Sequence, residues 1–594
     1  MSTRQLNELC LLILKDVYGE LASTVVGVLL ERGRLTAAGI GQHCELSLTT
    51  VQRSLIALIQ NRFVQHWSEK NKPVYYTAYW PEIYAIIWTG QMIALMNERG
   101  DAAAAEVVKN SHIYGHMRVE DFVQAYSEAE REGVQNALVR LLQERILVPT
   151  FDFDFNPVED IYSQFYTRRM QEMATERKAE SAKVTLAKAD ATGDQEVLFS
   201  KRLEPNIGLI AHESNEKMRI PKQKRLAQFD STEKVYSADP NCVVSINNDK
   251  FLVISRNRQL VELCAKRVGA ITSRVYAAVL KCYESKLNNC QEDLVPGTDH
   301  NVTSLEVARH IDGSLNLQDS IVLSTPKRVI NNTTTATKRL KTSKSYLSLN
   351  SNGQLDATNG TDDGVDKISE LDEPEQDAPQ VNGKIDLDIL NSHLEVLADS
   401  SIHFLQKAGT RGGGEWFVPY KLLIEDLKLH TYDNIIMNKY GVASTRILRV
   451  IRDKGKVDEK LLSQMTLLQS KDIRNYLSDL QSIGCVDLQE VPRGNDRAPT
   501  RTFYLWYHRP TNAYAQLLQQ LYQAMNRLYT RMMSERTRNP TLVSKLQRED
   551  VKGHEDEYLT ELERRELAEM RVKEQKLLGQ LFRIDQLVRI FRDY

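Results

Sequence analysis

One unit recurs along this chain and limits its fold more than any other feature. In the clearest copy, three segments have helical patterns and two have strand patterns joined by the polar tip SEKNKP: 18–32, 36–44, 47–61, FVQHW (63–67) and VYYTAYW (74–80). Three helices followed by a two-stranded wing form a winged helix. The sequence therefore predicts a mainly α chain with small β wings, built from tandem winged-helix domains.

The first copy has clear start and stop signals. Gly33 is expected to end the first helix, and Thr36 and Ser47 are expected to cap the next two. In the third helix, the apolar residues recur at helical spacing and should face the core: Leu48, Val51, Leu55, Leu58 and Ile59.

Weaker copies of this unit follow. The predicted boundaries are winged helix 1 at 1–80, winged helix 2 at 81–165, a polar and partly disordered linker at 166–238, winged helix 3 at 239–420 with a disordered insertion at 312–384, winged helix 4 at 421–509, and a helical hairpin at 510–594. In the second copy, ILVPTFDFDF is expected to be a strand pair or an extended arm. CVVSI and KFLVI are expected to be strands that open the third copy.

The last segment has apolar residues at alternating spacings of three and four. This pattern predicts a C-terminal antiparallel coiled-coil hairpin, which either pairs internally or accepts a helix of another chain. Glu574 falls at one seam position. The candidate partner-binding residues of this seam are Leu518, Leu521, Met525, Leu577, Leu581, Ile584 and Phe591.

Composition narrows the class of protein. Apolar residues make up 42% of the chain and charged residues 26%, enough for several cores. The seven cysteines contain no CxxC pair, which suggests a reducing compartment and no zinc site. No window approaches the ~18 apolar residues of a membrane span. Because motifs for catalysis, nucleotides and metals are missing, we expect no enzyme activity, cofactor, metal or small-molecule substrate.

The third helices predict protein partners rather than base reading. In the first, second and fourth copies, helical projection places a single cation on the outward face of the third helix: Arg53, Arg140 and Lys471, respectively. A protein that contacts six to ten phosphates needs a cluster of lysines and arginines. The formal net charge of −2 likewise requires any basic surface to be local.

The wings are the candidate DNA-contacting parts, and the fourth is the strongest candidate. Any such contact should be independent of base sequence. The candidates are Lys70, Lys72, Arg411, Arg493, Arg497 and Arg501. The basic clusters at 219–225 and 327–344 are either nuclear-import signals, DNA tethers or ordinary solvated linker. The acidic stretch at 362–377 is interpreted as linker.

The order of these modules resembles a known family. The stretches LTAAGIGQHCELSLTTVQRSLIALIQNRFV (35–64), GVASTRILRVIRDKGKVDEKLLSQMTLLQSKDIRNYLSDLQSIGCV (441–486) and the closing LLGQLFRIDQLVRIFRDY are similar to the RNA polymerase III-specific winged-helix subunits related to TFIIE-alpha. The resemblance spans the whole chain.

The resemblance implies a non-catalytic, nuclear subunit of RNA polymerase III. Its implied partners are the two other members of the initiation heterotrimer, the large clamp subunit and promoter DNA. Its implied role is promoter opening and initiation at tRNA, 5S rRNA and other small RNA genes. The alternative is a protein-only winged-helix scaffold of a cullin- or proteasome-lid-like assembly, although those proteins usually place long helical repeats before the winged helix.

Overall fold

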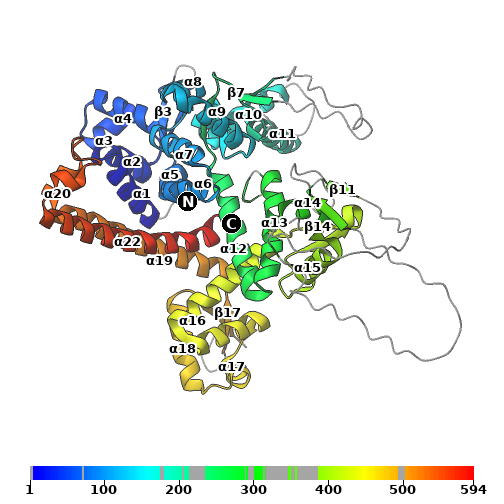
Figure 1. Cartoon of the computed structure of the whole chain (residues 1–594). Coiled ribbons are helices and arrows are strands. Elements are labelled where there is room, and N and C mark those ends of the chain that lie inside the picture. The colour runs from blue at the N-terminus through cyan, green and yellow to red at the C-terminus, as the bar shows by residue number, and fades with distance from the viewer. Residues whose placement is uncertain are drawn as a thin grey trace, which may run out of the picture. The chain divides into compact units, whose positions relative to one another are not determined.

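A computed structural model describes residues 4–69, 72–173, 180–203, 207–212, 235–287, 289–291, 300–311, 315, 317, 346–349, 355–357, 385–492 and 502–594 (Figure 1). The chain divides into two compact units. The first comprises Met1–Phe251 with Tyr440–Arg592, and the second comprises Leu252–Lys439 with Asp593–Tyr594. Helices with small antiparallel sheets make up both units, which confirms the predicted fold class at that level.

The first module has the predicted winged-helix order. Its elements are α2 (Glu20–Arg32), β1 (Leu35–Thr36), α3 (Ala37–Cys44), α4 (Leu48–Gln60), β2 (Val64–Trp67) and β3 (Tyr75–Ala78). The last strand lies between the other two, in the order β1-β3-β2. The side chains of Thr36 and Ser47 accept hydrogen bonds from Gly39 N and Thr50 N, so both predicted N-caps are confirmed.

The second module closes its sheet with a strand far along the chain. Its elements are α7 (Ala102–Tyr114), β4 (Met117–Arg118), α8 (Val119–Gln124), α9 (Glu128–Gln143), β5 (Leu147–Pro149) and β8 (Val243–Ile246). Strand β8 pairs with both β4 and β5 in the order β4-β8-β5. The expectation that CVVSI opens the third copy was therefore wrong. This strand completes the second module, in the position that β3 has in the first.

Of the stretch ILVPTFDFDF, the first part forms the strand β5 as expected, but the second part does not, and the expectation of a strand at KFLVI was wrong. Instead of forming strands, Asp152–Phe155 is a 3₁₀ turn, η2, in which the Asp154 carboxylate accepts a hydrogen bond of 2.8 Å from Phe151 N. KFLVI begins the helix α12 (Asn248–Arg267). A short apolar run fits a buried strand and a buried helix equally well, so periodicity does not separate them.

The predicted polar linker at 166–238 lies between the two wing strands β5 and β8 and contains regular structure. Here α10 (Val158–Glu172) packs against α11 (Glu180–Ser200), and β6 (Leu209–His212) pairs with β7 (Val235–Ala238). Both Arg169–Asp194 hydrogen bonds between the helices measure 2.7 Å. Among the α11 side chains that the structure describes, the fully buried ones are alanines, Ala187 and Ala191, which leave no large apolar stripe in the sequence.

The third module belongs to the second unit. Its elements are α13 (Ala270–Lys286), β9 (Val302–Thr303), α14 (Ser304–His310), α15 (Leu387–Asp399), β13 (Gln406–Gly409) and β14 (Glu415–Phe417), with the strand order β13-β14-β9. The predicted insertion at 312–384 falls between α14 and α15. Most of it lies outside the described residues. Within it, β10 (Tyr346–Leu349) pairs with β11 (Leu355–Ala357) on one side and with β12 (Ile385–Asp386) on the other.

The fourth module repeats the same topology. Helix α16 (Tyr420–Lys454) bends at Gly441, and its second part leads into β15 (Lys456–Val457), α17 (Glu459–Thr466), α18 (Ser470–Ser482), β16 (Val486–Pro492) and β17 (Thr502–His508). The strand order is β15-β17-β16. All four modules therefore place the last strand of the wing in the middle of a three-stranded sheet.

Positive φ angles recur at equivalent places in the modules. The residue that ends the second helix has φ near +55° in the first and fourth modules, namely Glu45 and Leu467. The residue two positions before the first wing strand also has positive φ, and it is Arg62, Arg145 or Gly484 in the first, second and fourth modules. The topology thus fixes these backbone conformations, and glycine occupies only one of the five positions.

The C-terminal helices pack on the N-terminal helices of the same unit. Here α19 (Pro510–Arg538) lies antiparallel to α22 (Glu561–Arg592), and α20 (Pro540–Leu546) and α21 (Glu555–Tyr558) lie in the turn between them (Figure 1). Helix α1 (Arg4–Val17) packs against α19 and α5 (Trp80–Ala85). A short 3₁₀ turn, η1 (Ile86–Trp88), joins α5 to α6 (Thr89–Glu98). The hairpin is present, and its description as a coiled coil stays a prediction.

Candidate interaction surfaces

The outward face of α4 combines polar and apolar side chains and carries a single cation. Ile56 is 69% exposed and Leu48 is 49% exposed, whereas Arg53 is the exposed cation of this helix. The prediction that Leu48 faces the core was wrong, because it is the first residue of α4, where the helix has just begun. Two large exposed apolar side chains on one short helix favour contact with a protein.

The other third helices are acidic or balanced. On α9 the exposed charges are Glu128, Glu130, Glu132 and Arg140, and Arg140 is already paired with Asp101 at 2.8 Å. The exposed charges of α15 are all carboxylates: Asp388, Glu395 and Asp399. On α18 they are Lys471, Asp472, Arg474 and Asp479, so the projection that gave this helix a single outward cation missed Arg474. None of these faces has the cation cluster that neutralising a phosphate backbone requires.

The described wing cations lie beside carboxylates. Lys72 Nζ is 2.6 Å from a Glu69 oxygen, and this pair lowers the pKa of Glu69 and raises the pKa of Lys72. Arg411 has a side chain that is 91% exposed and lies 4.0 Å from Glu415. Lys70 and the fourth-wing arginines Arg493, Arg497 and Arg501 lie outside the described residues.

A buried ion pair fixes the end of α22 to α5, η1 and α6. The Asp585 carboxylate is fully buried and accepts hydrogen bonds from Tyr84 Oη at 2.7 Å, Trp88 Nε1 at 3.2 Å and Arg589 Nε at 2.9 Å. Arg589, 1% exposed, also donates to Gln91 Oε1 at 2.5 Å and lies over the Phe251 ring. Burial and the Asp585 charge raise the pKa of Tyr84, so its hydroxyl remains a donor.

A second polar link joins three helices. The guanidinium of Arg536 on α19 lies 2.6 Å from Asp16 on α1 and 2.6 Å from Glu574 on α22. Tyr529 donates to the same Asp16 carboxylate at 3.1 Å. This explains why a carboxylate occupies a seam position of the apolar stripe: Glu574 has a cation opposite it.

The predicted partner-binding seam is largely buried within the chain. Leu521, Met525, Leu581 and Phe591 are buried, and Leu518, Leu577 and Ile584 are half-buried. The Phe591 ring contacts the Tyr514 ring at 5.1 Å across the hairpin. The seam therefore packs on this chain's own helices, and a partner-binding role for these residues stays a prediction.

A close backbone contact joins the first and second modules. Gln60, the last residue of α4, accepts a hydrogen bond from His116 N at 3.3 Å and donates from its side chain to the carbonyl of His116. Gly115 makes this approach possible. It has φ +74°, and an added Cβ would lie 2.3 Å from the carbonyl oxygen of Gln60.

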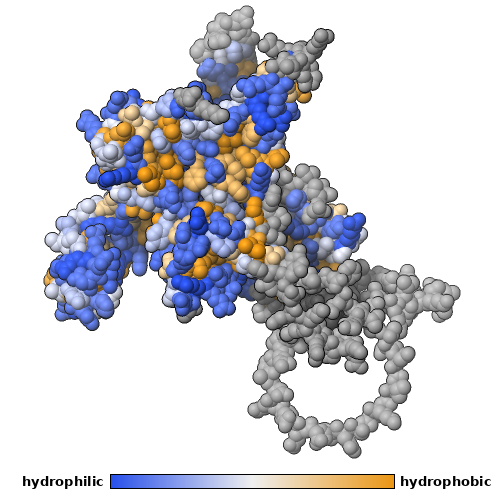
Figure 2. Space-filling view, turned by 90° about the horizontal axis from the view of Figure 1, so that it is seen from above, coloured by the Kyte–Doolittle hydropathy of each residue, from blue (hydrophilic) through white to orange (hydrophobic). Residues whose placement is uncertain are grey.

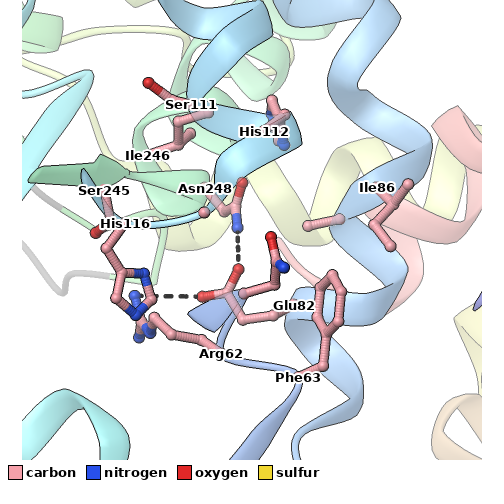
Figure 3. Close-up of a pocket in the computed structure, with 13 residues that line it drawn as sticks. Arg62, Phe63, Glu82, Ile86, Ser111, His112, His116, Ser245, Ile246 and Asn248 are labelled. Carbon is pink, nitrogen blue, oxygen red and sulfur yellow. Dashed lines mark hydrogen bonds and ion pairs between the residues drawn. The ribbon is translucent and has the colours of Figure 1, made fainter. Parts of the chain in front are cut away.

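Beside this joint is a polar cavity of about 50 Å³ (Figure 3). The Glu82 carboxylate lies 3.5 Å from Arg62 Nη1 and accepts a hydrogen bond of 2.6 Å from Asn248. Among the described residues, no hydrogen-bond partner is present for Arg62 Nε, His116 Nε2 or Asn248 Oδ1. A cavity of this size and polarity suits ordered water.

Burial shifts the ionisation of the groups around this cavity. Desolvation lowers the pKa of His112 to about 4, and desolvation together with the Arg62 charge lowers the pKa of His116 to about 4. Desolvation raises the pKa of Glu82. The joint therefore holds two neutral histidines near neutral pH, a feature that sequence reasoning missed because these histidines lie at a module boundary.

We expect Gly115→Ala to loosen this joint. The new methyl group would clash with the carbonyl of Gln60, and alanine would have to adopt a backbone conformation with positive φ. We therefore expect a loss of about 1–3 kcal/mol in the stability of the joint. Hydrogen exchange of amides 102–118 measures this loss. The control is Gly100→Ala, where φ is +77° but an added Cβ meets nothing within 4 Å. Equal effects of the two changes would show that close packing at Gly115 is unimportant.

The described residues contain no group of histidine, cysteine or acidic side chains that could hold a metal ion. Among the described helices, none is long and apolar enough to cross a membrane. In Figure 2, apolar residues form patches among polar ones on the face that is shown.

Comparison with known proteins gives one consistent result. Family models match residues 8–69 (RNA polymerase III subunit RPC82 helix-turn-helix domain), 136–427 (RNA polymerase III subunit RPC82) and 432–508 (POLR3C, C-terminal winged-helix domain).

Full-length relatives agree with these models. The chain is 36% identical to DNA-directed RNA polymerase III subunit RPC3 of Yarrowia lipolytica, over 100% of this chain and 98% of the relative. It is 27% identical to the subunit rpc3 of Botryotinia fuckeliana, with 99% of each chain covered. It is 26% identical to RPC3 of Saccharomyces cerevisiae, with 98% and 92% covered.

Proposed function

Because this chain belongs to the RPC82/RPC3 family of RNA polymerase III subunits, we propose that it is a non-catalytic subunit that acts in promoter opening and initiation. As a subunit of that enzyme, it has the other RNA polymerase III subunits as partners and belongs to the transcription machinery. The protein-only scaffold of a cullin- or lid-like assembly is accordingly the wrong alternative.

We also propose the partners in closest contact, the location and the target genes. The partners in closest contact are the two other members of the initiation heterotrimer and the large clamp subunit, the location is the nucleus, and the target genes encode tRNA, 5S rRNA and other small RNAs. The candidate import signals at 219–225 and 327–344 lie outside the described residues.

One observation supports a docking role above all others: the exposed faces of the third helices lack clustered cations. On α4 the outward face combines a single arginine with exposed Ile56 and Leu48, and on α15 it is acidic. In a winged helix that reads bases, the corresponding helix enters the major groove. These faces instead suit protein surfaces, where apolar side chains become buried.

DNA contact is assigned to the fourth wing. Its three arginines, Arg493, Arg497 and Arg501, occur within nine residues without an intervening lysine, and the only acid between them is Asp496. The cations at the described parts of the other wings, Lys72 and Arg411, have carboxylates within 4.0 Å. The fourth wing therefore offers the most positive charge to a phosphate backbone, without base readout.

We expect Arg493→Ala, Arg497→Ala and Arg501→Ala together to weaken DNA binding without affecting assembly. If each arginine contacts one phosphate, the slope of log affinity against log salt should fall by about 3. Fluorescence anisotropy of a labelled duplex with the assembled polymerase measures this slope.

A matched control replaces three exposed cations of α22, namely Arg564, Lys576 and Arg583, by alanine. It removes the same charge and should leave the slope unchanged. The wing assignment fails if the wing variant disrupts assembly or if it keeps the salt slope of the unmodified complex.

A further inference from the structure

Helix α17 and its C-cap carry an exposed apolar ridge, formed by Leu461, Met465 and Leu467. These side chains are 39%, 42% and 86% exposed, respectively. Leu461 and Met465 are four residues apart, so they share one face of the helix. Leu462 and Thr466 lie about 100° further around the helix and are fully buried. The ridge is therefore a second apolar face that the module's own core does not use.

Leu467 is in a backbone conformation that does not favour leucine. Its φ is +55°, in the left-handed region, where glycine or asparagine is accommodated more easily. In the first module the equivalent position, at φ +56°, is occupied by the polar residue Glu45. The topology fixes this backbone conformation, because the N–H of Leu467 donates to the carbonyl of Ser463 and ends α17. It does not require leucine, however, and the leucine side chain lies in water.

Exposed lysines lie close to the ridge residues in the sequence. Lys460 precedes Leu461, and Lys471 follows Leu467 by four residues; both lysines are exposed. Glu459, on the same helix, is already paired with Arg474 at 2.6 Å. Apart from the paired Arg474, six exposed cations accompany three exposed carboxylates between residues 442 and 482: Arg446, Arg449, Lys454, Lys456, Lys460 and Lys471, against Asp453, Asp472 and Asp479.

We propose that this ridge binds an acidic polypeptide segment of another polymerase subunit, with apolar residues at helical spacing. An amphipathic helix of that kind would cover the ridge with its apolar residues and place its carboxylates near Lys460 and Lys471. Duplex DNA fits less well, because phosphates would leave the exposed leucines and methionine in water. The inference rests on the docking role proposed above, but it does not depend on DNA contact by any wing.

Photocrosslinking in the assembled polymerase tests the proposal. The change Leu467→p-benzoylphenylalanine places the reactive group on the ridge, and Glu45→p-benzoylphenylalanine places it at the equivalent turn of the first module. We expect the probe at 467 to crosslink to one segment of another subunit that is rich in Asp and Glu and contains apolar residues. The probe at 45 should not reach that segment. A crosslink to DNA, to a basic segment or to no subunit would overturn the proposal.

Charge and apolar contributions are then separated with the benzophenone probe kept at 467. Lys460→Glu with Lys471→Glu should reduce the yield of that crosslink at least tenfold, and Leu461→Ser with Met465→Ser should do the same. The exposed pair Leu562→Ser and Val572→Ser on α22 is the apolar control and should leave the yield unchanged. Thermal unfolding should be similar for all variants because the replaced side chains are exposed. An unchanged yield in the lysine or the ridge variant would contradict the proposal, whatever happens to DNA binding in the wing variant.

Discussion

Replacing Asp585 by alanine should release the end of α22 from the helices α5 and η1. The change leaves Arg589 buried without its carboxylate and removes the acceptor of both Tyr84 Oη and Trp88 Nε1. Removing one partner of a buried ion pair costs about 3–5 kcal/mol, because the remaining charge stays desolvated. We therefore expect the amides of residues 581–592 to lose a corresponding part of their protection in hydrogen exchange.

Two further variants make this result specific. Gln586→Ala changes the neighbouring exposed residue of the same helix and should leave protection unchanged. Asp585→Leu combined with Arg589→Met removes both charges and should recover part of the loss, because apolar residues of similar size avoid the desolvation cost. If Asp585→Ala behaves like Gln586→Ala, the ion pair does not hold the hairpin in place.

Much of the module architecture could be predicted from local sequence signals. Thr36 and Ser47 act as N-caps as expected, and the apolar face of α4 was correct from Val51 onward, because capping and helical periodicity are short-range effects. The same signals did not reveal that β8 belongs with β4 and β5. A local sequence pattern does not identify the partner of a strand that pairs across about a hundred residues. The boundaries of the modules as a whole stay a prediction.

The interaction surfaces were predictable only in part. The single exposed cation on α4 followed from helical projection, and the structure agrees. The buried pair Asp585–Arg589 was missed because i,i+4 charges on a helix usually indicate a solvated surface. The ridge at Leu461, Met465 and Leu467 was also missed. Its apolar residues fit a core pattern equally well, and only their exposure distinguishes the two.

Acidification from pH 7.5 to 5.0 should destabilise the joint between the first two modules. A histidine of the unfolded chain has a pKa near 6.5 and is largely protonated at pH 5, whereas His112 and His116, with pKa values of about 4, are not. The unfolded chain then holds more protons, so stability is lost as the pH falls from about 6.5 toward 4. With an allowance for the partial exposure of His112, the two histidines together should lower the free energy of unfolding by about 2–4 kcal/mol at pH 5.

The double variant His112→Gln with His116→Gln isolates this effect. It should reduce the difference in thermal unfolding midpoint between pH 7.5 and 5.0, as followed by tryptophan fluorescence. Part of the difference should remain, because burial also lowers the pKa of His66. Glu82 acts in the opposite direction, since its raised pKa makes protonation favour the folded state as the pH falls. The control is His43→Gln, because His43 is exposed. If the double variant and the control lose the same amount of stability between pH 7.5 and 5.0, protonation of His112 and His116 does not destabilise the joint.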